Sequence, residues 1–391
     1  MEIFITGSGT ISSIGNNVAE SLNSLRDQQP GIKLGAFQAL PNYRVGAVPF
    51  SNAELMEKFN LTTEGSRTAL LGMIAAKEAF AGHSIDSKIR TGLISGTSVG
   101  GMDMSEKEYK NFLEGTNHNP LNYRHHASGT SSEEIANELN ISDFINTIST
   151  ACSSAANALM MGARMIQQGM LDRVVVGGTD GLSSFTISGF KSLMIFDDEW
   201  CRPFDESRKG LNLGEGAGFL VLESEKSLAI SKQTPLAKLS GWSNASDAFH
   251  QTASSPNGYG ATLSMQEALN VAGLQPSDID YINAHGTATP NNDLSESHAI
   301  KSIFKDNIPP FSSTKAYTGH TLAASGGIEA VFAIEAIQQG LLYPNLNFST
   351  PIEETGLTPQ LKFESGKTIK HVLSNSFGFG GNNSTVILSA L

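Results

Sequence analysis

The sequence predicts an α/β protein made of two halves, each a parallel sheet with helices on both faces. Three observations lead to this class. Short β-branched runs alternate with longer helical patterns. The chain has 391 residues, more than a single hydrophobic core usually supports. A strand near the middle is followed by polar residues and a proline over 224–235. We therefore expect an N-terminal half over residues 1–230 and a C-terminal half over 231–391.

The expected elements follow one another in a regular order. In the N-terminal half we expect strands over 3–5, 91–95, 173–176 and 218–222, and helices over 68–80, 132–139 and 155–168. In the C-terminal half we expect strands over 235–240, 279–284, 371–373 and 385–388, and helices over 264–272 and 326–339. The halves are alike in kind, but their sequence identity is too weak to establish a repeat.

Composition excludes several classes of protein. Hydrophobic residues make up 39% and charged residues 16%, which argues against disorder and against a coiled coil. A net charge of −12 argues against general binding to nucleic acid or to a membrane surface. Two cysteines cannot form a disulfide framework, and neither a secretory signal nor an apolar run long enough to span a bilayer is apparent. We expect a soluble cytoplasmic protein.

Cys152 lies in a context typical of a nucleophile at the start of a helix. Residues 147–161 are TISTACSSAANALMM, so an apolar approach leads to the cysteine and a helix-compatible run follows at once. Unpaired backbone amides and the helix dipole at such a position favour a thiolate and can hold an oxyanion. Taken alone, however, Cys152 is equally well explained as a small buried apolar residue. Other segments must decide between the two.

Two histidines occupy similar glycine-flanked turns in the C-terminal half. An apolar strand leads to His285 in NAHGTAT, and His320 lies in TGHTLAASGG before a small-residue helix. The ends of parallel strands are where sheets of this kind place reactive groups. Thr287 and Thr289 can hold the first ring or its loop. Either histidine alone would be explained as a buried structural residue, but the pair, C-terminal to a candidate nucleophile, indicates a site.

The segment 374–384, SNSFGFGGNNS, is the third feature. It is either a glycine turn with two core aromatics, Phe377 and Phe379, or a loop that presents a backbone amide to a bound carbonyl. A phosphate loop is disfavoured because no Walker lysine follows the glycines. Neither histidine has a second ligand at a recognisable spacing, so we expect no metal and no cofactor.

Together these segments resemble the β-ketoacyl-acyl carrier protein synthases of the I/II type, over essentially the whole chain. The matching segments, in order, are TACSS around Cys152, RPFD at 202–205, GEGAG at 214–218, NAHGT around His285, KAYTGH ending at His320, and GFGG at 378–381. Each alone would be weak, whereas their combination and order are specific. The resemblance implies the thiolase fold, with two related halves in a five-layer αβαβα sandwich, and a homodimer or a ketosynthase heterodimer.

The resemblance also implies residue roles. Cys152 would take an acyl chain from acyl carrier protein as a thioester, and His285 and His320 would stabilise the enolate formed when malonyl-acyl carrier protein loses its carboxylate. The amides of Cys152 and Phe379 would form the oxyanion hole, with Phe379 also gating the acyl pocket. Supporting roles fall to Lys315, Glu329, Thr287 and Thr289, a pocket position to Val99 and Phe377, and a mobile loop opposite the gate to Asp247 and His250.

The implied function is decarboxylative Claisen condensation in fatty acid or polyketide/polyene biosynthesis. The alternative is a chain-length-factor-like partner with little activity of its own, although such a subunit would be expected to lack the nucleophile. A thiolase would need a second active cysteine near the C-terminus, and none follows Cys201. Type III synthases resemble this pattern but place an asparagine where one of the histidines stands.

Carrier proteins are acidic, so docking is expected to use local basic groups despite the net negative charge. The candidates are Arg67, Arg202, Arg208 and Lys209. The region near Arg67 is less basic than a housekeeping synthase would require, which favours a dedicated carrier protein or a specialised pathway. The segment 117–128 departs from the family pattern, and we expect its His118, His125 and His126 to be surface or interface residues.

Overall fold

The computed structural model describes residues 2–391 and has the α/β architecture expected from the sequence. The N-terminal half contains β1 (Phe4–Ser12), α1 (Val18–Arg26), β2 (Lys33–Leu34), β3 (Arg44–Val45), α2 (Asn52–Lys58), α3 (Arg67–Ala79), β4 (Thr91–Gly96), α4 (Met102–Glu114), the 3₁₀ helix η1 (Pro120–His126), α5 (Ser128–Leu139), β5 (Phe144–Ile148), α6 (Ser154–Gln167), β6 (Arg173–Asp180), α7 (Ser184–Ser192), β7 (Gly216–Glu223) and α8 (Glu225–Ser231). The C-terminal half contains β8 (Ala237–Ser246), α9 (Tyr259–Ala272), η2 (Pro276–Asp278), β9 (Tyr281–Asn283), α10 (Pro290–Phe304), β10 (Phe311–Ser312), α11 (Lys315–Thr318), η3 (Leu322–Ala324), α12 (Ser325–Gln339), β11 (His371–Gly378) and β12 (Asn382–Ser389). Each expected strand and helix is present, most of them longer than expected.

The two halves repeat one topology that sequence identity could not establish. The strand order is β5-β4-β6-β7-β1 in the first half and β10-β9-β11-β12-β8 in the second. In both halves the first three strands are parallel, and the last two add in antiparallel fashion, so the prediction of parallel sheets is wrong for these two strands of each half. Only Phe4 and Ile5 of β1, pairing with Lys238 and Ala237 of β8, join the halves into one ten-stranded sheet.

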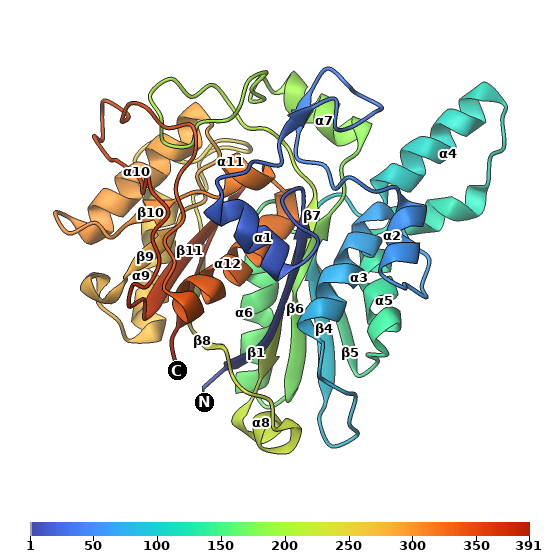
Figure 1. Cartoon of the computed structure of the whole chain (residues 1–391), viewed down its shortest axis with the longest axis horizontal. Helices are drawn as coiled ribbons and strands as arrows, with labels where there is room; N and C mark the ends of the chain where they lie inside the picture. Colours follow the sequence, from blue (N-terminus) through green and yellow to red (C-terminus); the bar gives the residue numbers. More distant parts are fainter. Residues whose placement is uncertain (1) are drawn as a thin grey trace.

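Helices form the other layers of the molecule (Figure 1). α6 contacts strands of both halves, β4 and β6 on one side and β8 and β12 on the other, and α12 does the same with β6, β7 and β11. α3 and α5 cover the outer face of the first half, and α9, with α10 packed against it, covers the second. The order from one side to the other is helices, sheet, helices, sheet, helices.

The sequence of α6 explains its central position. Small and apolar side chains surround most of this helix, and ten of its residues are buried. Gly162 marks the closest approach, since a Cβ there would lie 2.5 Å from Cγ1 of Val176. Larger side chains along α6 would push the two sheets apart. The boundary expected after residue 230 falls just before the end of α8, a short helix in the stretch where a linker was expected.

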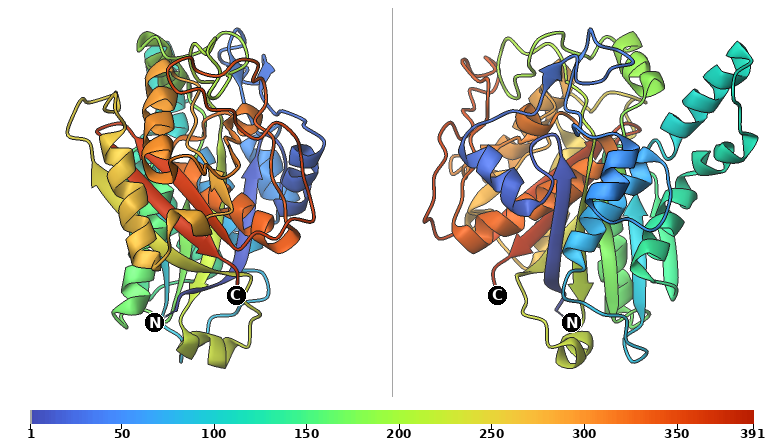
Figure 2. Two further views of the ribbon diagram at one scale, coloured as in Figure 1. Left: turned by 90° about the vertical axis from the view of Figure 1, so that its left-hand side faces the viewer. Right: turned by 45° about the vertical axis from the view of Figure 1, so that its right-hand side comes forward.

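α4 and η1 form an arm, residues 102–126, that projects from the body of the molecule (Figures 1 and 2). Large apolar side chains are exposed along it, namely Tyr109, Phe112, Leu113 and Leu121. The prediction that all three histidines of this region lie at the surface or in an interface is wrong for His125, which is buried within the chain. That ring is buried at the base of the arm, where its Nδ1 lies 2.6 Å from the carboxylate of Glu134.

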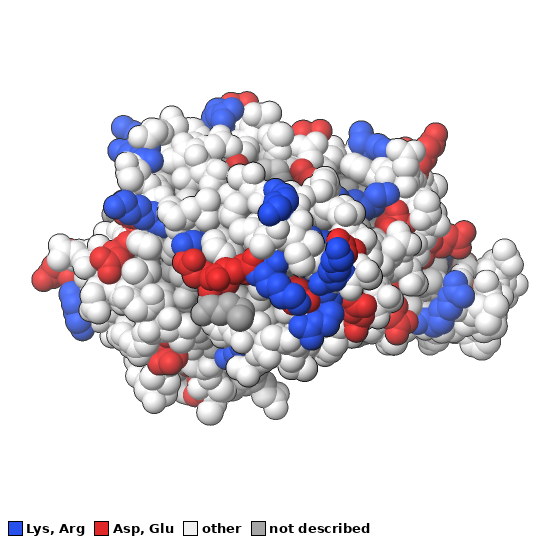
Figure 3. Space-filling view, turned by 90° about the horizontal axis from the view of Figure 1, so that it is seen from below, with Lys and Arg blue, Asp and Glu red and all other residues white. Residues whose placement is uncertain are grey.

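Charged side chains of both signs are interspersed on the face that carries α8 (Figure 3). The net charge of −12 is therefore not concentrated there as a single acidic area. Within residues 2–391, no helix combines the length and the apolar character needed to cross a membrane.

Candidate active site

Cys152 lies on a tight turn directly before α6. The residue before it, Ala151, has φ +52°, a left-handed conformation that costs energy in a residue with a Cβ. Serine hydroxyls hold this turn, because Ser153 Oγ donates to Thr150 O over 2.7 Å and Ser154 Oγ donates to Ala151 O over 2.6 Å. The small residues around the cysteine thus build the turn that the sequence predicted.

The backbone N–H groups of Cys152 itself and of Phe379 both lower the pKa of the Cys152 thiol. Gly378 lets the second segment approach this closely, since a Cβ there would lie 2.8 Å from Thr150 O and 3.2 Å from Cys152 N. Backbone donors of this kind can hold an oxyanion formed at a carbonyl attached to the sulfur. The two segments expected to form an oxyanion hole therefore lie against each other.

The resting sulfur is a thiol rather than the thiolate favoured by the local sequence. Burial raises the pKa of Cys152 to about 12, and the carboxylate of Asp180 adds to the rise. The ammonium of Lys315 and the two N–H groups lower the pKa, but by less than burial raises it. Ionisation must therefore accompany the attack, with a neighbouring base to take the proton.

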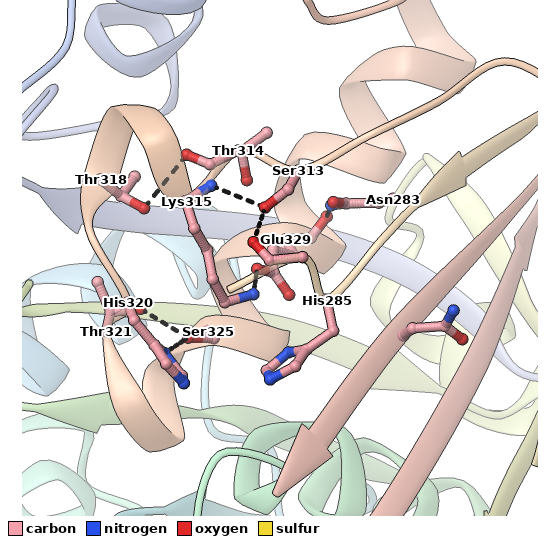
Figure 4. A network of polar contacts seen from close by, with 12 residues as sticks. Asn283, His285, Ser313, Thr314, Lys315, Thr318, His320, Thr321, Ser325 and Glu329 are labelled. Carbon is pink, nitrogen blue, oxygen red and sulfur yellow. Dashed lines mark hydrogen bonds and ion pairs between the residues drawn. The ribbon is translucent and has the colours of Figure 1, made fainter. Parts of the chain in front are cut away.

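His320 is buried, and its surroundings determine which ring nitrogen carries the proton. The N–H of Leu322 donates to Nδ1 over 3.2 Å, and Ser325 Oγ lies 3.1 Å from the same nitrogen (Figure 4). Because a donor already points at Nδ1, we assign the proton to Nε2. The ring lines the same cavity as Cys152, so it can offer Nε2–H to a bound carbonyl oxygen.

His285 approaches from the other turn, with its ring centroid 5.3 Å from that of His320 and the ring planes nearly perpendicular. A buried carboxylate holds its backbone, since Glu296 accepts the N–H groups of His285 and Gly286 at 2.9 and 2.8 Å. Burial raises the pKa of Glu296 to about 7. Phe377 packs against the ring of His285, with centroids 5.7 Å apart.

A buried ion pair lies beside the two rings (Figure 4). Lys315 Nζ bonds the carboxylate of Glu329, and each side chain is at most 3% exposed. Burial lowers the pKa of His285 and of His320 well below the ordinary value, and the Lys315 charge lowers both further. Both imidazoles are therefore neutral.

One cavity of about 340 Å³ brings these groups together. Cys152, both histidines, Phe377 and Phe379 line it, and so do Thr287 and Thr289, whose hydroxyls are 2.9 Å apart. Lys209 lies at the same cavity and is exposed. The residues expected from three distant segments thus converge on one space.

The loop expected to act as a gate is tied to the loop expected opposite it. Asp247 N–H donates to Gly381 O, and Gly380 N–H donates to Gln251 O, over 3.0 and 2.7 Å. Phe379 itself stacks on Phe190 of α7 at a centroid distance of 5.8 Å. A movement of either loop must therefore break bonds to the other.

Three expected pocket or loop residues do not line the cavity. Val99 is half-buried and packs against an apolar cluster whose member Leu211 does line it. Asp247 accepts hydrogen bonds from Ser255 Oγ and from the N–H of Gly260, so it shapes its own loop. His250 is exposed.

Arg67 is wrong as a docking residue, because its guanidinium is used inside the protein. Nε and Nη2 bond Glu215 at 2.7 and 2.6 Å, and the remaining N–H groups meet Val48 O, Phe50 O and Asn52 Oδ1. The side chain is only 13% exposed. Arg208 is half-buried and donates to two backbone carbonyls, those of Asp205 and Pro290, and Arg202 is also half-buried.

Sequence reasoning missed three residues that shape the site. Asp180 and Ser325 contact the turn around His320, and Phe190 supports Phe379. Ser325 lies within the segment TGHTLAASGG but was given no role, and the other two lie in no distinctive motif. A signal existed only for Asp180, which ends a strand as reactive groups do in such sheets.

Comparisons with known proteins agree with this arrangement. A family model described as "Beta-ketoacyl synthase, N-terminal domain" matches residues 1–227, and one described as "Beta-ketoacyl synthase, C-terminal domain" matches residues 236–349. A 3-oxoacyl-[acyl-carrier-protein] synthase 2 of Staphylococcus aureus is 32% identical, over 98% of this chain and 97% of that protein.

Two solved structures are similar over their whole length. "The ishigamide ketosynthase/chain length factor" superposes with a TM-score of 0.92 at 28% identity, covering 100% of this chain and 99% of that one. The ketosynthase ApeO, solved with its chain length factor ApeC from Xenorhabdus doucetiae, has a TM-score of 0.85 at 31% identity, covering 100% and 98%. The fold and the family resemblance predicted from the sequence are confirmed.

Proposed function

This chain belongs to the beta-ketoacyl synthase family, and we propose that Cys152, His285 and His320 perform the family's reaction in it. The reaction is the acyl carrier protein-dependent Claisen condensation of fatty acid or polyketide synthesis. One observation carries the assignment of residues: a thiol at a helix start and two neutral imidazoles share a single cavity. A chain-length-factor role is not favoured, because the complete set of reactive groups is present.

In the first half-reaction the sulfur of Cys152 attacks the acyl thioester of the carrier. The thiol proton passes to the imidazole of His285, since Nε2 of His320 already carries a proton, and it ends on the departing carrier thiol. The negative oxygen of the tetrahedral intermediate is held by the N–H groups of Cys152 and Phe379. The carbon–sulfur bond to the carrier then breaks, leaving the acyl chain on Cys152.

In the second half-reaction a malonyl thioester enters the cavity. Its thioester oxygen accepts hydrogen bonds from the two rings, with Nε2–H of His320 as one donor. The bond to the carboxylate breaks, carbon dioxide leaves, and the electron pair forms an enolate on the held oxygen. The enolate carbon attacks the acyl-Cys152 carbonyl, and the carbon–sulfur bond breaks to release a β-ketoacyl carrier. The sulfur then takes up one proton from solvent to restore the thiol. Neutral rings suit the decarboxylation step because they donate hydrogen bonds to the thioester oxygen. They carry no positive charge that would hold the substrate carboxylate in an ion pair.

Lys315→Met is expected to shift the acidic limb of the decarboxylation pH profile to higher pH. The Lys315 charge lowers the pKa of both rings, so its removal raises those pKa values and lets each ring protonate at a higher pH. A protonated His320 cannot accept the Leu322 N–H, so activity falls as the pH drops through the raised pKa. Carbon dioxide release from a malonyl carrier, measured across the pH range, gives the profile.

Two further variants make the shift interpretable. Lys315→Met with Glu329→Gln removes the buried carboxylate that would otherwise be left without its partner, and it should show the same direction of shift. Lys77→Met breaks the ion pair with Glu138 at the edge of α3 and should leave the profile unchanged. An acidic limb that stays in place in both Lys315 variants would contradict the assigned electrostatic role.

The carrier protein is expected to dock at the mouth of the cavity. Lys209 supports this location, because it is exposed and lines the cavity, where it can meet a negatively charged group on the carrier's prosthetic arm. Met194 lines the same cavity and is 88% exposed. The curated relative acts, by its name, on acyl-carrier-protein substrates.

We also propose that two copies of the chain pair along β5 and the arm. β5 is the outermost strand of its half, so one edge has no strand partner in the monomer. The arm beside it exposes Tyr109, Phe112 and Leu113. Light scattering is expected to give twice the chain mass of 41.5 kDa, and Phe112→Glu should shift the population toward monomer. A monomeric wild-type chain would instead favour a different partner, such as the chain length factor of the solved ketosynthase.

The function is tested by separating the two half-reactions. Intact-protein mass spectrometry after mixing with acyl-loaded carriers should show one acyl group added per chain, and the carrier that loads best identifies the preferred chain. Carbon dioxide release from malonyl carrier should then accompany formation of a β-ketoacyl carrier. A purified chain that loads no acyl group and releases no carbon dioxide, alone or as its dimer, would refute the enzyme assignment.

A further inference from the structure

The buried carboxylate of Asp180 receives hydrogen bonds from both halves of the molecule, next to the turn that carries His320. Asp180 ends β6 in the first half and is fully buried. Its neighbour Gly181 is anchored to α3, because Gly181 N–H donates to Thr68 Oγ1 over 3.0 Å. The carboxylate therefore projects from a rigid point of the fold.

Its two oxygens receive hydrogen bonds from both halves. Oδ1 accepts Thr97 Oγ1 at 2.6 Å and the N–H groups of Ser98 and Val99 at 3.0 and 3.1 Å, all from the loop after β4. Oδ2 accepts the N–H of Ala323 at 2.9 Å, from η3 in the second half. Both oxygens are satisfied, and every partner is a neutral donor.

Ala323 belongs to the short turn that sets the state of His320. Leu322, the residue before it, donates its N–H to His320 Nδ1 and does so at φ +52°, a left-handed conformation unfavourable for leucine. Such a backbone persists only where surrounding contacts hold it. The bond from Ala323 to Asp180 is the contact that fixes the next peptide of this turn to the first half.

We propose that Asp180 is a positioning residue for decarboxylation, holding the Leu322–Ala323 turn so that His320 keeps Nδ1 as acceptor and presents Nε2–H to the cavity. The inference rests on the proposed function for its catalytic consequence. The backbone of His320 is already bonded to Asn212 and Gly214 of the first half, and Asp180 adds a side-chain bond that holds the following turn.

The charge of Asp180 has no other evident use at this site. Among residues 2–391, no lysine or arginine pairs with it. It also works against the nucleophile, because its negative charge raises the pKa of the Cys152 thiol. A carboxylate that hinders ionisation of the cysteine is not there to activate it. Four converging donors need an acceptor-only group, and an ionised carboxylate is the one that fits.

The variant Asp180→Asn distinguishes a positioning role of the carboxylate from general damage to the structure. The amide has nearly the same size, but its NH₂ group must face an N–H or O–H donor in place of an acceptor. Decarboxylation of malonyl carrier is expected to fall about 10- to 100-fold, because the donor to the enolate is displaced. Alkylation of Cys152 by iodoacetamide should proceed at the same rate or faster, since a negative charge near the thiol has been removed.

Asp172→Asn is the matched control. Asp172 directly precedes β6, at the opposite end of the strand from Asp180, and it bonds Arg90 and Lys226 near the surface. This variant loses surface ion pairs but should keep both rates. A normal decarboxylation rate in Asp180→Asn would overturn the inference, and so would an equal fall in both reactions, which would indicate a structural role alone.

A spectroscopic measurement tests the inference without enzyme activity. In chains labelled with ¹⁵N-histidine, His320 should show the Nε2-protonated form, identified by comparison with His320→Gln. Asp180→Asn should add the other tautomer or broaden these signals, while Asp172→Asn should not. An unchanged His320 signal would contradict the inference. A wild-type chain that shows this tautomer but never decarboxylates would instead refute the proposed function.

Discussion

Cys152→Ala is expected to abolish both acyl loading and condensation. The sulfur is the only group at the start of α6 that can form the thioester, and the N–H donors of Cys152 and Phe379 have no substrate oxygen to hold without that bond. Condensation should fall by about four orders of magnitude or more, as in enzymes that lose a nucleophile. Intact-mass spectrometry should show no added acyl group with any carrier, and product analysis should show no β-ketoacyl carrier.

Cys201→Ala provides the control, because Cys201 is the other free, buried cysteine. Burial raises the pKa of its thiol to about 12 as well, yet it does not line the cavity and its sulfur bonds the carbonyl of Lys315. That variant should load acyl groups normally. The midpoint of thermal unfolding should change by no more than a few degrees in either variant. An acyl adduct that survives Cys152→Ala would place the nucleophile elsewhere.

His320→Ala and His285→Ala are expected to impair decarboxylation far more than acyl loading. Each removes a neutral donor to the oxygen on which the enolate charge collects, whereas the oxyanion hole at Cys152 uses backbone groups that both variants keep. Carbon dioxide release should fall about 10²- to 10⁴-fold. Loading should fall less, because only relay of the thiol proton is affected.

The paired measurement is a malonyl decarboxylation assay beside the mass shift on Cys152 in the same preparation. His371→Ala is a suitable control, because His371 begins β11 far along the strand from Phe377 and bonds only Ser389 through its ring. Loading that collapses while decarboxylation survives would contradict the assigned roles. Such a result would move the histidines to the first half-reaction.

The fold class could be predicted because its signals are local. The alternation of β-branched and helical runs depends only on residues that are close in sequence. It predicted β4, β6 and α6 to within a few residues of their bounds. The turns around Cys152 and His285 could be found for the same reason, since serine and glycine build them from adjacent positions. The topological repeat could not be found this way, because strand order depends on pairing between distant segments.

Charge and protonation were decided by the tertiary structure. Arg67 looked like a surface cation until the chain brought it to Glu215, 148 residues away. The helix start favours a Cys152 thiolate, but burial beneath the second half raises its pKa instead. His125 shows the same effect, since its partner Glu134 and its burial both come from packing of the arm.

The sequence by itself determined the α/β class, the two-half organisation and the identity of the nucleophile and the two histidines as candidates. Tertiary structure decided that these groups share one cavity, that both rings are neutral, and that Asp180 ties one half to the other. The physical reason is the distance along the sequence between the residues that interact. Turn geometry and periodicity follow from contacts within a few residues, whereas burial, ion pairing and proton placement follow from contacts that only the folded chain makes.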